Sequence, residues 1–353
     1  GRWLATNWGV PGLGSYTDAL RLWPLPGSTS QEVKTLKLSQ RGGWTHLVFD
    51  PQGRFLFVVE TSDRAYVVPL DGSPVQALDA LPGESDLGGA AVSPSGRRVA
   101  TAFGTGRGSK TLRVWDLQTG DLEVFDLPEG SSSLPAGLFQ GIDDLAFADE
   151  STLFSAGDGG IRRWDLESGE HELVFAARPG HHATMAVGRN GRTALVLEGA
   201  MAEDREGWGP LKVVDLATGA TRELPAFGDP VRQAIALDAS GTVAASGDRE
   251  GILRVGRLSG GEPHLLLGHE GAIDFVSISP DERWVASTGE DDTLRLWPMP
   301  DLDEPPLHTL PRERLIGKLK TLTNLRAVRD PEAPNGWTIE LDTFPGWKDV
   351  PRW

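Results

Sequence analysis

Residues 269–298 read HEGAIDFVSISPDERWVASTGEDDTLRLWP, and this stretch decides the fold. Two turns divide it, at Pro280-Asp281-Glu282 and at Gly289-Glu290-Asp291-Asp292. The segments between the turns are short and rich in β-branched and aromatic residues, which is typical of strands. Acidic residues and glycine supply the backbone freedom that tight hairpin turns require. The stretch therefore predicts three antiparallel strands, the last of which ends at Trp297-Pro298.

The last strand of this unit recurs along the chain. Its seven versions are Leu20–Pro24, Ala65–Pro69, Leu112–Asp116, Ile161–Asp165, Leu211–Asp215, Leu253–Arg257 and Leu294–Pro298. The anchor positions 23, 68, 115, 164, 214, 256 and 297 are spaced by 45, 47, 49, 50, 42 and 41 residues. A period in the forties with about four strands per unit is the signature of a β-propeller. The sequence thus predicts an all-β fold with seven blades of four antiparallel strands each.

These repeats resemble the WD40-repeat family over roughly positions 1–310. In that family a hydrogen-bond relay often ties a blade together through a histidine, a serine or threonine, an aspartate in a turn, and the tryptophan. The last unit matches the relay with His269, Ser287, Asp291 and Trp297. The fourth unit keeps Ser155, Asp158 and Trp164 but has no histidine before its first strand. Other units are more divergent, so the resemblance implies that they depend more on apolar packing than on a buried polar relay.

The chain divides into a propeller over residues 1–310 and a C-terminal extension over 311–353. Residues 311–322 predict a short helix with proline at its start, and 323–328 and 337–341 predict strands. The first unit begins at its second strand, which leaves one strand of that blade to come from elsewhere. Either a strand of the extension closes the ring, or sequence preceding Gly1 does, because the chain reads as part of something longer.

The charge and composition of the chain limit the kinds of molecule that it is expected to bind. The chain has 34 basic and 50 acidic side chains, for a formal net charge of −16, and it has no cysteine. An acidic surface repels phosphate backbones and anionic lipids, so a protein or peptide, preferably basic, is expected in place of nucleic acid or membrane. The absence of cysteine excludes disulfides and thiolate sites and fits a reducing compartment, which favours the cytoplasm. We expect a monomer.

Catalytic chemistry finds little support in the sequence. His181-His182 has no acidic partner at a recognisable spacing, and we interpret the pair as solvated loop residues. The glycine-rich segment 104–110 joins two strands and opens no helix, so it lacks the helix N-terminus of a phosphate loop. Glu290-Asp291-Asp292 lacks the alternate-position oxygen ligands of a calcium loop.

We therefore predict no catalytic residues, metal or cofactor. The alternative is a propeller enzyme of the hydrolase or lactonase type, with a metal in the central channel.

The extension carries a second resemblance. Residues 322–328 and 344–347 are similar to the end of WD-repeat regions in bacterial multidomain signalling proteins, notably serine/threonine kinases. None of the kinase nucleotide-binding or catalytic-loop motifs occurs in this sequence. The resemblances together imply a non-catalytic binding platform, serving as the sensor or scaffold of a larger signalling protein with a kinase domain upstream.

Loops held on a rigid scaffold are where binding residues usually lie. The loops that enter the first strand of each blade converge on one rim, and the predicted contact residues are Trp44, His46, Gln140, Asp143, His182, Arg232, Asp274 and Glu290. Trp208 is a further candidate, in the long charged insertion 199–209. Its indole either anchors a partner or packs back onto a neighbouring blade.

Overall fold

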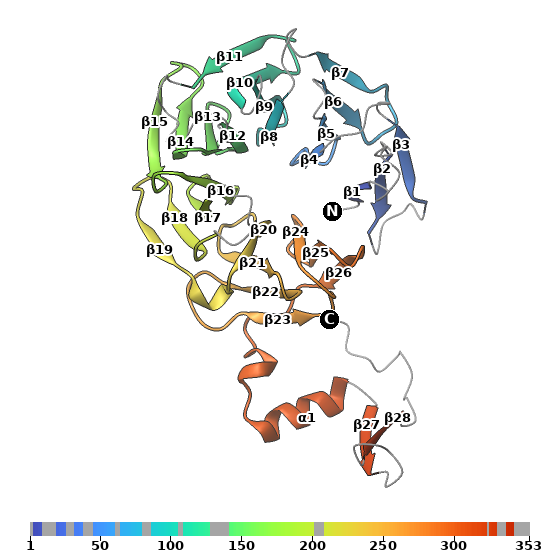
Figure 1. The fold of residues 1–353 in the computed structure, drawn as a ribbon. Helices are drawn as coiled ribbons and strands as arrows, with labels where there is room; N and C mark the ends of the chain where they lie inside the picture. Colours follow the sequence, from blue (N-terminus) through green and yellow to red (C-terminus); the bar gives the residue numbers. More distant parts are fainter. Residues whose placement is uncertain are drawn as a thin grey trace.

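The fold is an all-β, seven-bladed β-propeller followed by a short C-terminal helix, as the repeat spacing predicted (Figure 1). The computed structural model describes residues 3–8, 19–25, 32–37, 45–60, 64–79, 86–104, 109–127, 141–200, 208–322, 325–329 and 337–341. Within these residues the blades follow one another around the ring in sequence order. In blades 2 to 6 the four strands run from the innermost to the outermost in order along the chain.

The strands have the following bounds. Blade 1 comprises β1 (Trp3–Trp8), β2 (Ala19–Pro24) and β3 (Lys34–Lys37), and blade 2 comprises β4 (Thr45–Phe49), β5 (Phe55–Glu60), β6 (Arg64–Pro69) and β7 (Gln76–Asp79). Blade 3 comprises β8 (Asp86–Val92), β9 (Arg98–Gly104), β10 (Ser109–Asp116) and β11 (Leu122–Asp126). Blade 4 comprises β12 (Ile142–Phe147), β13 (Thr152–Gly157), β14 (Gly160–Asp165) and β15 (His171–Ala176). Blade 5 comprises β16 (His181–Val187), β17 (Thr193–Ala200), β18 (Lys212–Asp215) and β19 (Thr221–Glu223), followed by the 3-10 turn η1 (Pro225–Phe227). Blade 6 comprises β20 (Pro230–Leu237), β21 (Val243–Asp248), β22 (Ile252–Arg257) and β23 (His264–Leu267), and blade 7 comprises β24 (Ile273–Ile278), β25 (Trp284–Gly289) and β26 (Leu294–Pro298).

The core lies between blades. Both faces of a blade pack against neighbours, so most residues of the middle strands are apolar or small, and every residue of β21 is buried. Six apolar clusters fill the six junctions from blade 1 to blade 7. Burying one leucine- or phenylalanine-sized side chain contributes about 1.5–3 kcal/mol, so these junctions supply most of the stabilisation.

Polar contacts reinforce the junctions at the end of the ring where the first and second strands of each blade turn, which we call the lower end. The Arg54 guanidinium donates to the Ser95 carbonyl, and the Ser95 amide donates to Glu150 Oε1 at 2.7 Å. The Asn190 side chain donates to the Ser240 carbonyl at 2.8 Å. These bonds fasten the turns of blades 2, 3 and 4 to one another, and the turn of blade 5 to that of blade 6.

The first and last blades hold three strands each in the described part of the chain. Strand β1 pairs with β2 as β25 pairs with β26, so blade 1 begins at its second strand, as expected, and has no described innermost strand. Blade 7 has no described outermost strand.

The extension follows the ring as η2 (Leu307–Thr309), α1 (Arg312–Leu322), β27 (Leu325–Arg329) and β28 (Trp337–Leu341). The helix starts one residue after the predicted proline, and both predicted strands form. They pair with each other, and neither pairs with β1 or β26, so the expectation that a strand of the extension completes the first blade is wrong for these residues. The physical reason is the local hairpin, which satisfies their backbone groups without the ring; Figure 1 shows it outside the propeller.

Candidate functional site

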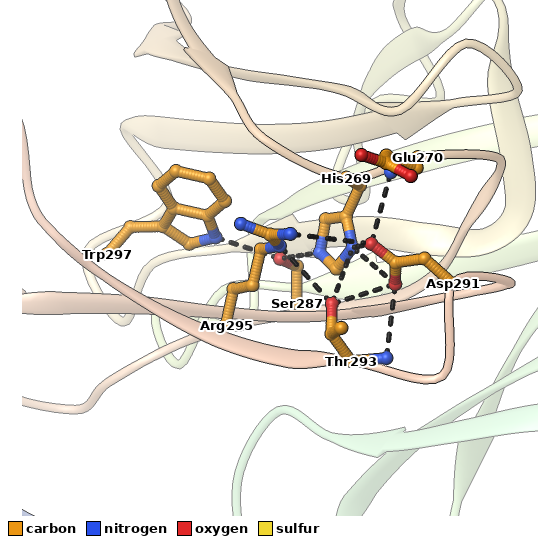
Figure 2. A network of polar contacts seen from close by, with 7 residues as sticks. All are labelled: His269, Glu270, Ser287, Asp291, Thr293, Arg295 and Trp297. Atoms are coloured by element: carbon orange, nitrogen blue, oxygen red, sulfur yellow. Dashed lines mark hydrogen bonds and ion pairs between the residues drawn. The ribbon is translucent and has the colours of Figure 1, made fainter.

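A continuous polar relay crosses blade 7 at the opposite end of the ring, which we call the upper end (Figure 2). It joins the four side chains that the sequence pattern singled out. His269 Nδ1 lies 3.0 Å from both Asp291 carboxylate oxygens, and His269 Nε2 lies 2.8 Å from Ser287 Oγ. The Trp297 indole donates to the same Ser287 oxygen at 2.8 Å. The relay thus ties the loop before β24 to strands β25 and β26.

One proton arrangement satisfies every member of the relay. His269 donates from Nδ1 to Asp291, the Ser287 hydroxyl donates to Nε2, and the serine oxygen accepts the Trp297 N–H. Burial raises the pKa of the Asp291 carboxyl, but hydrogen bonds from Thr293, the Glu270 amide and His269 outweigh it and hold that pKa well below its usual range. The carboxylate therefore stays ionised, and its role is to hold the turn and the incoming loop in place.

Blades 4 and 1 keep part of this arrangement. In blade 4 the Trp164 indole donates to Ser155 Oγ at 2.8 Å. Asp158 follows β13, where its amide donates to the Gly141 carbonyl at 2.9 Å. In blade 1 the Trp23 indole donates to Thr6 Oγ1 at 2.8 Å, a pair that the sequence reasoning missed. The signal was present, because Thr6 lies on the strand before an anchor tryptophan.

Blade 5 replaces the relay by a buried ion cluster. Glu198, which is 3% exposed, accepts from Lys212 Nζ at 2.8 Å and from the Arg178 amide in the loop that enters the blade. Burial raises the pKa of the Glu198 carboxyl, but these hydrogen bonds and the two positive charges bring it below its ordinary value. The cluster fastens the incoming loop to the third strand, as Asp291 does in blade 7.

Sequence reasoning also missed the signal for this cluster. A basic residue recurs just inside the third strand of six blades, at Arg21, Arg113, Arg162, Lys212, Arg254 and Arg295. In three blades it pairs with an acidic residue from the second strand or the turn after it: Lys212 with Glu198, Arg254 with Asp248, and Arg295 with Asp291. Acid–base pairing at the upper end therefore recurs in blades 5, 6 and 7.

Two aspartates join the innermost strands of blades 4 and 5. His182 is fully buried, and its Nδ1 lies 3.0 Å from Asp143 Oδ2. Next to it Asp144 accepts from the Thr184 hydroxyl at 2.5 Å and from the Met185 amide at 3.1 Å. The interpretation of His181-His182 as solvated loop residues is wrong, because both lie in β16 and the acidic partner of His182 comes from the neighbouring blade. His182 therefore fastens two blades and presents no side chain to a partner.

Several innermost strands carry a β-bulge where they start. The extra residue is Gly89 in β8, Asp143 in β12 and Asp274 in β24, and the start of β20 around Arg232 is irregular as well. A bulge re-aims the side chain of its extra residue and is common beside functional sites. Asp143 and Asp274, two of the predicted rim residues, therefore do not follow the regular alternation of side chains between the two faces of the strand.

The remaining predicted rim residues are placed as follows. His46 is half-buried in β4, and Glu290 is exposed in the turn after β25. Trp208 is half-buried, pairs with Gly199 and packs on the cluster between blades 5 and 6, which favours the packing interpretation over the anchor. Trp44 and Gln140 lie outside the described residues.

An acidic surface covers the upper end of blades 6 and 7. We call it the acidic rim, and its members are Asp229, Glu250, Glu270, Asp274, Glu290 and Asp292. All are exposed except Asp274, which is half-buried. In the same loops Arg249 is exposed, while His269 is held in the relay. This end of the ring can therefore attract positively charged groups.

Comparison with known proteins agrees with this geometry. Residues 261–298 match the family model described as WD domain, G-beta repeat, which covers β23 and the three strands of blade 7. The chain is a seven-bladed β-propeller whose last blade is similar to a WD40 repeat. It is 27% identical over 248 residues to Protein tipD from Dictyostelium discoideum, a match that covers 68% of this chain and 34% of that protein. The chain thus spans about a third of the length of this relative. WD40 propellers generally serve as protein-interaction platforms and are usually non-catalytic.

Two further properties concern the described residues alone. These residues hold no group of three or more histidine, aspartate or glutamate side chains arranged to bind a metal ion. In the same part of the chain, no helix is long and apolar enough to cross a membrane.

The pKa shifts predict acid sensitivity. Asp291, Glu198 and Asp238 have pKa values below their ordinary range in the fold, so each stabilises the native state at neutral pH, and this stabilisation is lost as protons bind. We expect the free energy of unfolding to fall as the pH drops below about 4.5, through the ordinary values of these groups. Denaturant unfolding at a series of pH values measures this. Glu198→Gln should flatten the dependence, whereas Glu223→Gln, on an exposed residue of the same blade, should leave it unchanged; equal curves for both variants would contradict the assignment.

Proposed function

We propose that this propeller is a non-catalytic platform that binds a protein or peptide at the upper end of the ring, with basic groups of the partner on the acidic rim. The observation that carries the proposal is the combination of a rigid ring with acidic loops at one end. The relay of blade 7 and the Asp248–Arg254 pair fix the very loops that bear Glu250, Glu270 and Glu290.

Rigid presentation matters because loops that are already ordered lose little conformational entropy on binding. The fixed acidic partners, Asp248 and Asp291, are neutralised within the blade, so the charges left at the surface belong to exposed side chains. Complementary charge speeds association and selects basic partners, and it does so most at low salt.

The proposal extends to the parent protein. The resemblance of residues 322–328 and 344–347 to bacterial signalling proteins supports a role as a monomeric, cytoplasmic sensor or scaffold, linked to an upstream serine/threonine kinase domain. The kinase activity would belong to that domain. Binding of a basic segment at the upper end would then transmit a signal to the kinase domain.

Neutralising the acidic rim tests the proposal. The variant Glu250→Gln, Glu270→Gln, Glu290→Gln removes three exposed charges and leaves the relay residue Asp291 in place. We expect its association with proteins captured from the source cells to slow by about tenfold or more at low salt, and the wild-type rate to fall as salt rises. The matched control changes three exposed glutamates at the lower end, Glu167, Glu170 and Glu262, to glutamine. Equal behaviour of the two variants, or capture of acidic or nucleic-acid partners without salt dependence, would defeat the proposal.

A further inference from the structure

Three junctions between blades are closed at the lower end of the ring by an arginine of the chain. In each of them a guanidinium donates to a backbone carbonyl of the next blade. The pairs are Arg54 with Ser95, between blades 2 and 3, Arg98 with Glu150, between blades 3 and 4, and Arg222 with Leu258, between blades 5 and 6. A guanidinium at the lower end of a junction is therefore a recurrent feature of this ring.

The junction between blades 4 and 5 has a cleft in place of such an arginine. Thr152 stands where Arg98 stands in blade 3, because each pairs with the aspartate directly after the anchor tryptophan of its blade. The threonine side chain is too short to cross to blade 5, and among the described residues no arginine side chain of blade 4 donates to a carbonyl of blade 5. The cleft has a volume of about 600 Å³, which is typical of sites for small molecules.

Close contacts between blades 4 and 5 bound the cleft. A Cβ atom at Gly191, in the turn between β16 and β17, would lie 2.7 Å from Ala148 Cβ. A Cβ atom at Gly219, in the turn between β18 and β19, would lie 2.9 Å from the Val174 carbonyl oxygen. Both distances are shorter than a side chain allows, so the blades touch at both turns. A cleft that is bounded in this way suits a small molecule better than an extended segment of a second protein.

The lining of the cleft favours a cation with an apolar stem. Phe154 and Leu216, which are 2% and 1% exposed, form its floor. Four carboxylates and two guanidiniums lie around this floor and leave a net charge of −2: Asp149, Asp165, Glu170, Glu172, Arg163 and Arg192. Acidic groups attract a positive group, and the apolar floor can pack against the methylene stem that carries it.

Three acceptors of this lining remain for a ligand. Asp149 caps its own turn through Oδ1, and Glu172, whose side chain is 58% exposed, makes one ion pair within its blade. The Gly191 carbonyl stands where the Glu150 carbonyl accepts from Arg98, since each residue follows the one that caps its turn. Within the described residues, neither Asp149 Oδ2 nor the Gly191 carbonyl accepts a hydrogen bond.

We propose that the cleft binds a small molecule with a guanidinium group, such as free arginine. The guanidinium takes the place that Arg98 fills one junction earlier. It donates to the Gly191 carbonyl and to Glu172, and its stem packs on Leu216. Glu172 corresponds to Glu123, whose carboxylate lies 3.9 Å from Arg98. A planar group with five donors in a fixed fork matches these acceptors better than an ammonium does. The site lies at the lower end and does not depend on the function proposed above.

Titration of the full chain with L-arginine, followed by NMR of its leucine methyl groups, tests the proposal. We expect saturable shifts of the Leu216 signals and no comparable shift at Leu166, which occupies the same position in blade 4. Citrulline carries a neutral group in place of the guanidinium, so it should bind more weakly by about tenfold or more, and lysine should also bind more weakly than arginine. Equal binding of arginine and citrulline, or the absence of saturation, would overturn the proposal.

Filling the cleft with an arginine of the chain provides a second test. Thr152→Arg copies Arg98 and should abolish the binding of free arginine. Thr193→Arg places an arginine at the same position in blade 5, where Arg222 already closes the junction, and should leave the binding unchanged. Circular dichroism verifies that each variant is folded. A folded Thr152→Arg variant that binds arginine as the wild type does would refute the assignment of the ligand to this cleft.

A pair of charge variants tests the acceptor without filling the cleft. Glu172→Gln should weaken arginine binding by about tenfold or more, whereas Glu123→Gln, at the same position in blade 3, should not. The rim variant with glutamine at positions 250, 270 and 290 should bind arginine as the wild type does, which separates this proposal from the proposed function. Equal affinities of the variants at positions 172 and 123 would contradict the proposal.

Discussion

Replacing Trp164 with alanine is expected to lower the free energy of unfolding by about 3–5 kcal/mol. The side chain is 1% exposed and belongs to the cluster between blades 3 and 4. Its ring lies 6.4 Å from that of Phe125 in edge-on contact and 4.8 Å from that of His171. Alanine would leave a cavity between two blades and remove the indole donor of Ser155. Denaturant unfolding followed by circular dichroism measures the loss.

A half-buried tryptophan of blade 7 provides the matched control. Trp284 is only half-buried, so Trp284→Ala should cost less than half as much as Trp164→Ala. Trp164→Phe should fall between wild type and alanine, because it keeps most of the packing but leaves the Ser155 hydroxyl without the indole. Equal losses at positions 164 and 284 would show that the junctions between blades are not the principal source of stability.

Asp291→Ala is expected to cost about 1–3 kcal/mol. The substitution removes the acceptor of His269 and of the Glu270 and Thr293 amides, so a buried imidazole and two ordered backbone groups lose their partner. The loop that enters blade 7 should loosen as well. Thermal melting measures the stability, and hydrogen exchange at residues 268–272 measures the order of the loop.

The neighbouring Asp292 is the control for this variant. It is exposed and has a φ of 57°, a left-handed conformation that asparagine tolerates, so Asp292→Asn should change the melting temperature little. A wild-type melting temperature for Asp291→Ala would remove the relay from the account of how blade 7 is held.

Sequence reasoning succeeded where the signal is local. The hydrogen-bonded residues His269, Ser287, Asp291 and Trp297 fall within one repeat, and the pairing of neighbouring strands brings them together. The helix at Arg312–Leu322 and the two strands after it follow from local pattern too. The position of these two strands outside the ring does not follow from local pattern, because pairing between them competes with pairing to a blade.

Contacts between blades could not be predicted from the sequence. Asp143 and His182 are 39 residues apart, and their contact depends on how two sheets sit against each other. The β-bulge that sets Asp143 apart from the regular alternation leaves no clear mark in the sequence. Glu198 was missed because it lies near the end of a strand, where a charged residue reads as solvated, whereas the fold buries it against Lys212.

Site-specific photo-crosslinking tests the central claim, that a partner binds the upper end of the ring, most directly. A photoreactive residue is placed at Glu290, on the acidic rim, or at Glu167, at the lower end; both positions are exposed. After irradiation in source-cell extract, the account predicts crosslinks from position 290 to basic segments of a protein, reduced at high salt, and none of comparable yield from position 167. Crosslinks that arise mainly from position 167, or equally from both positions, would contradict it.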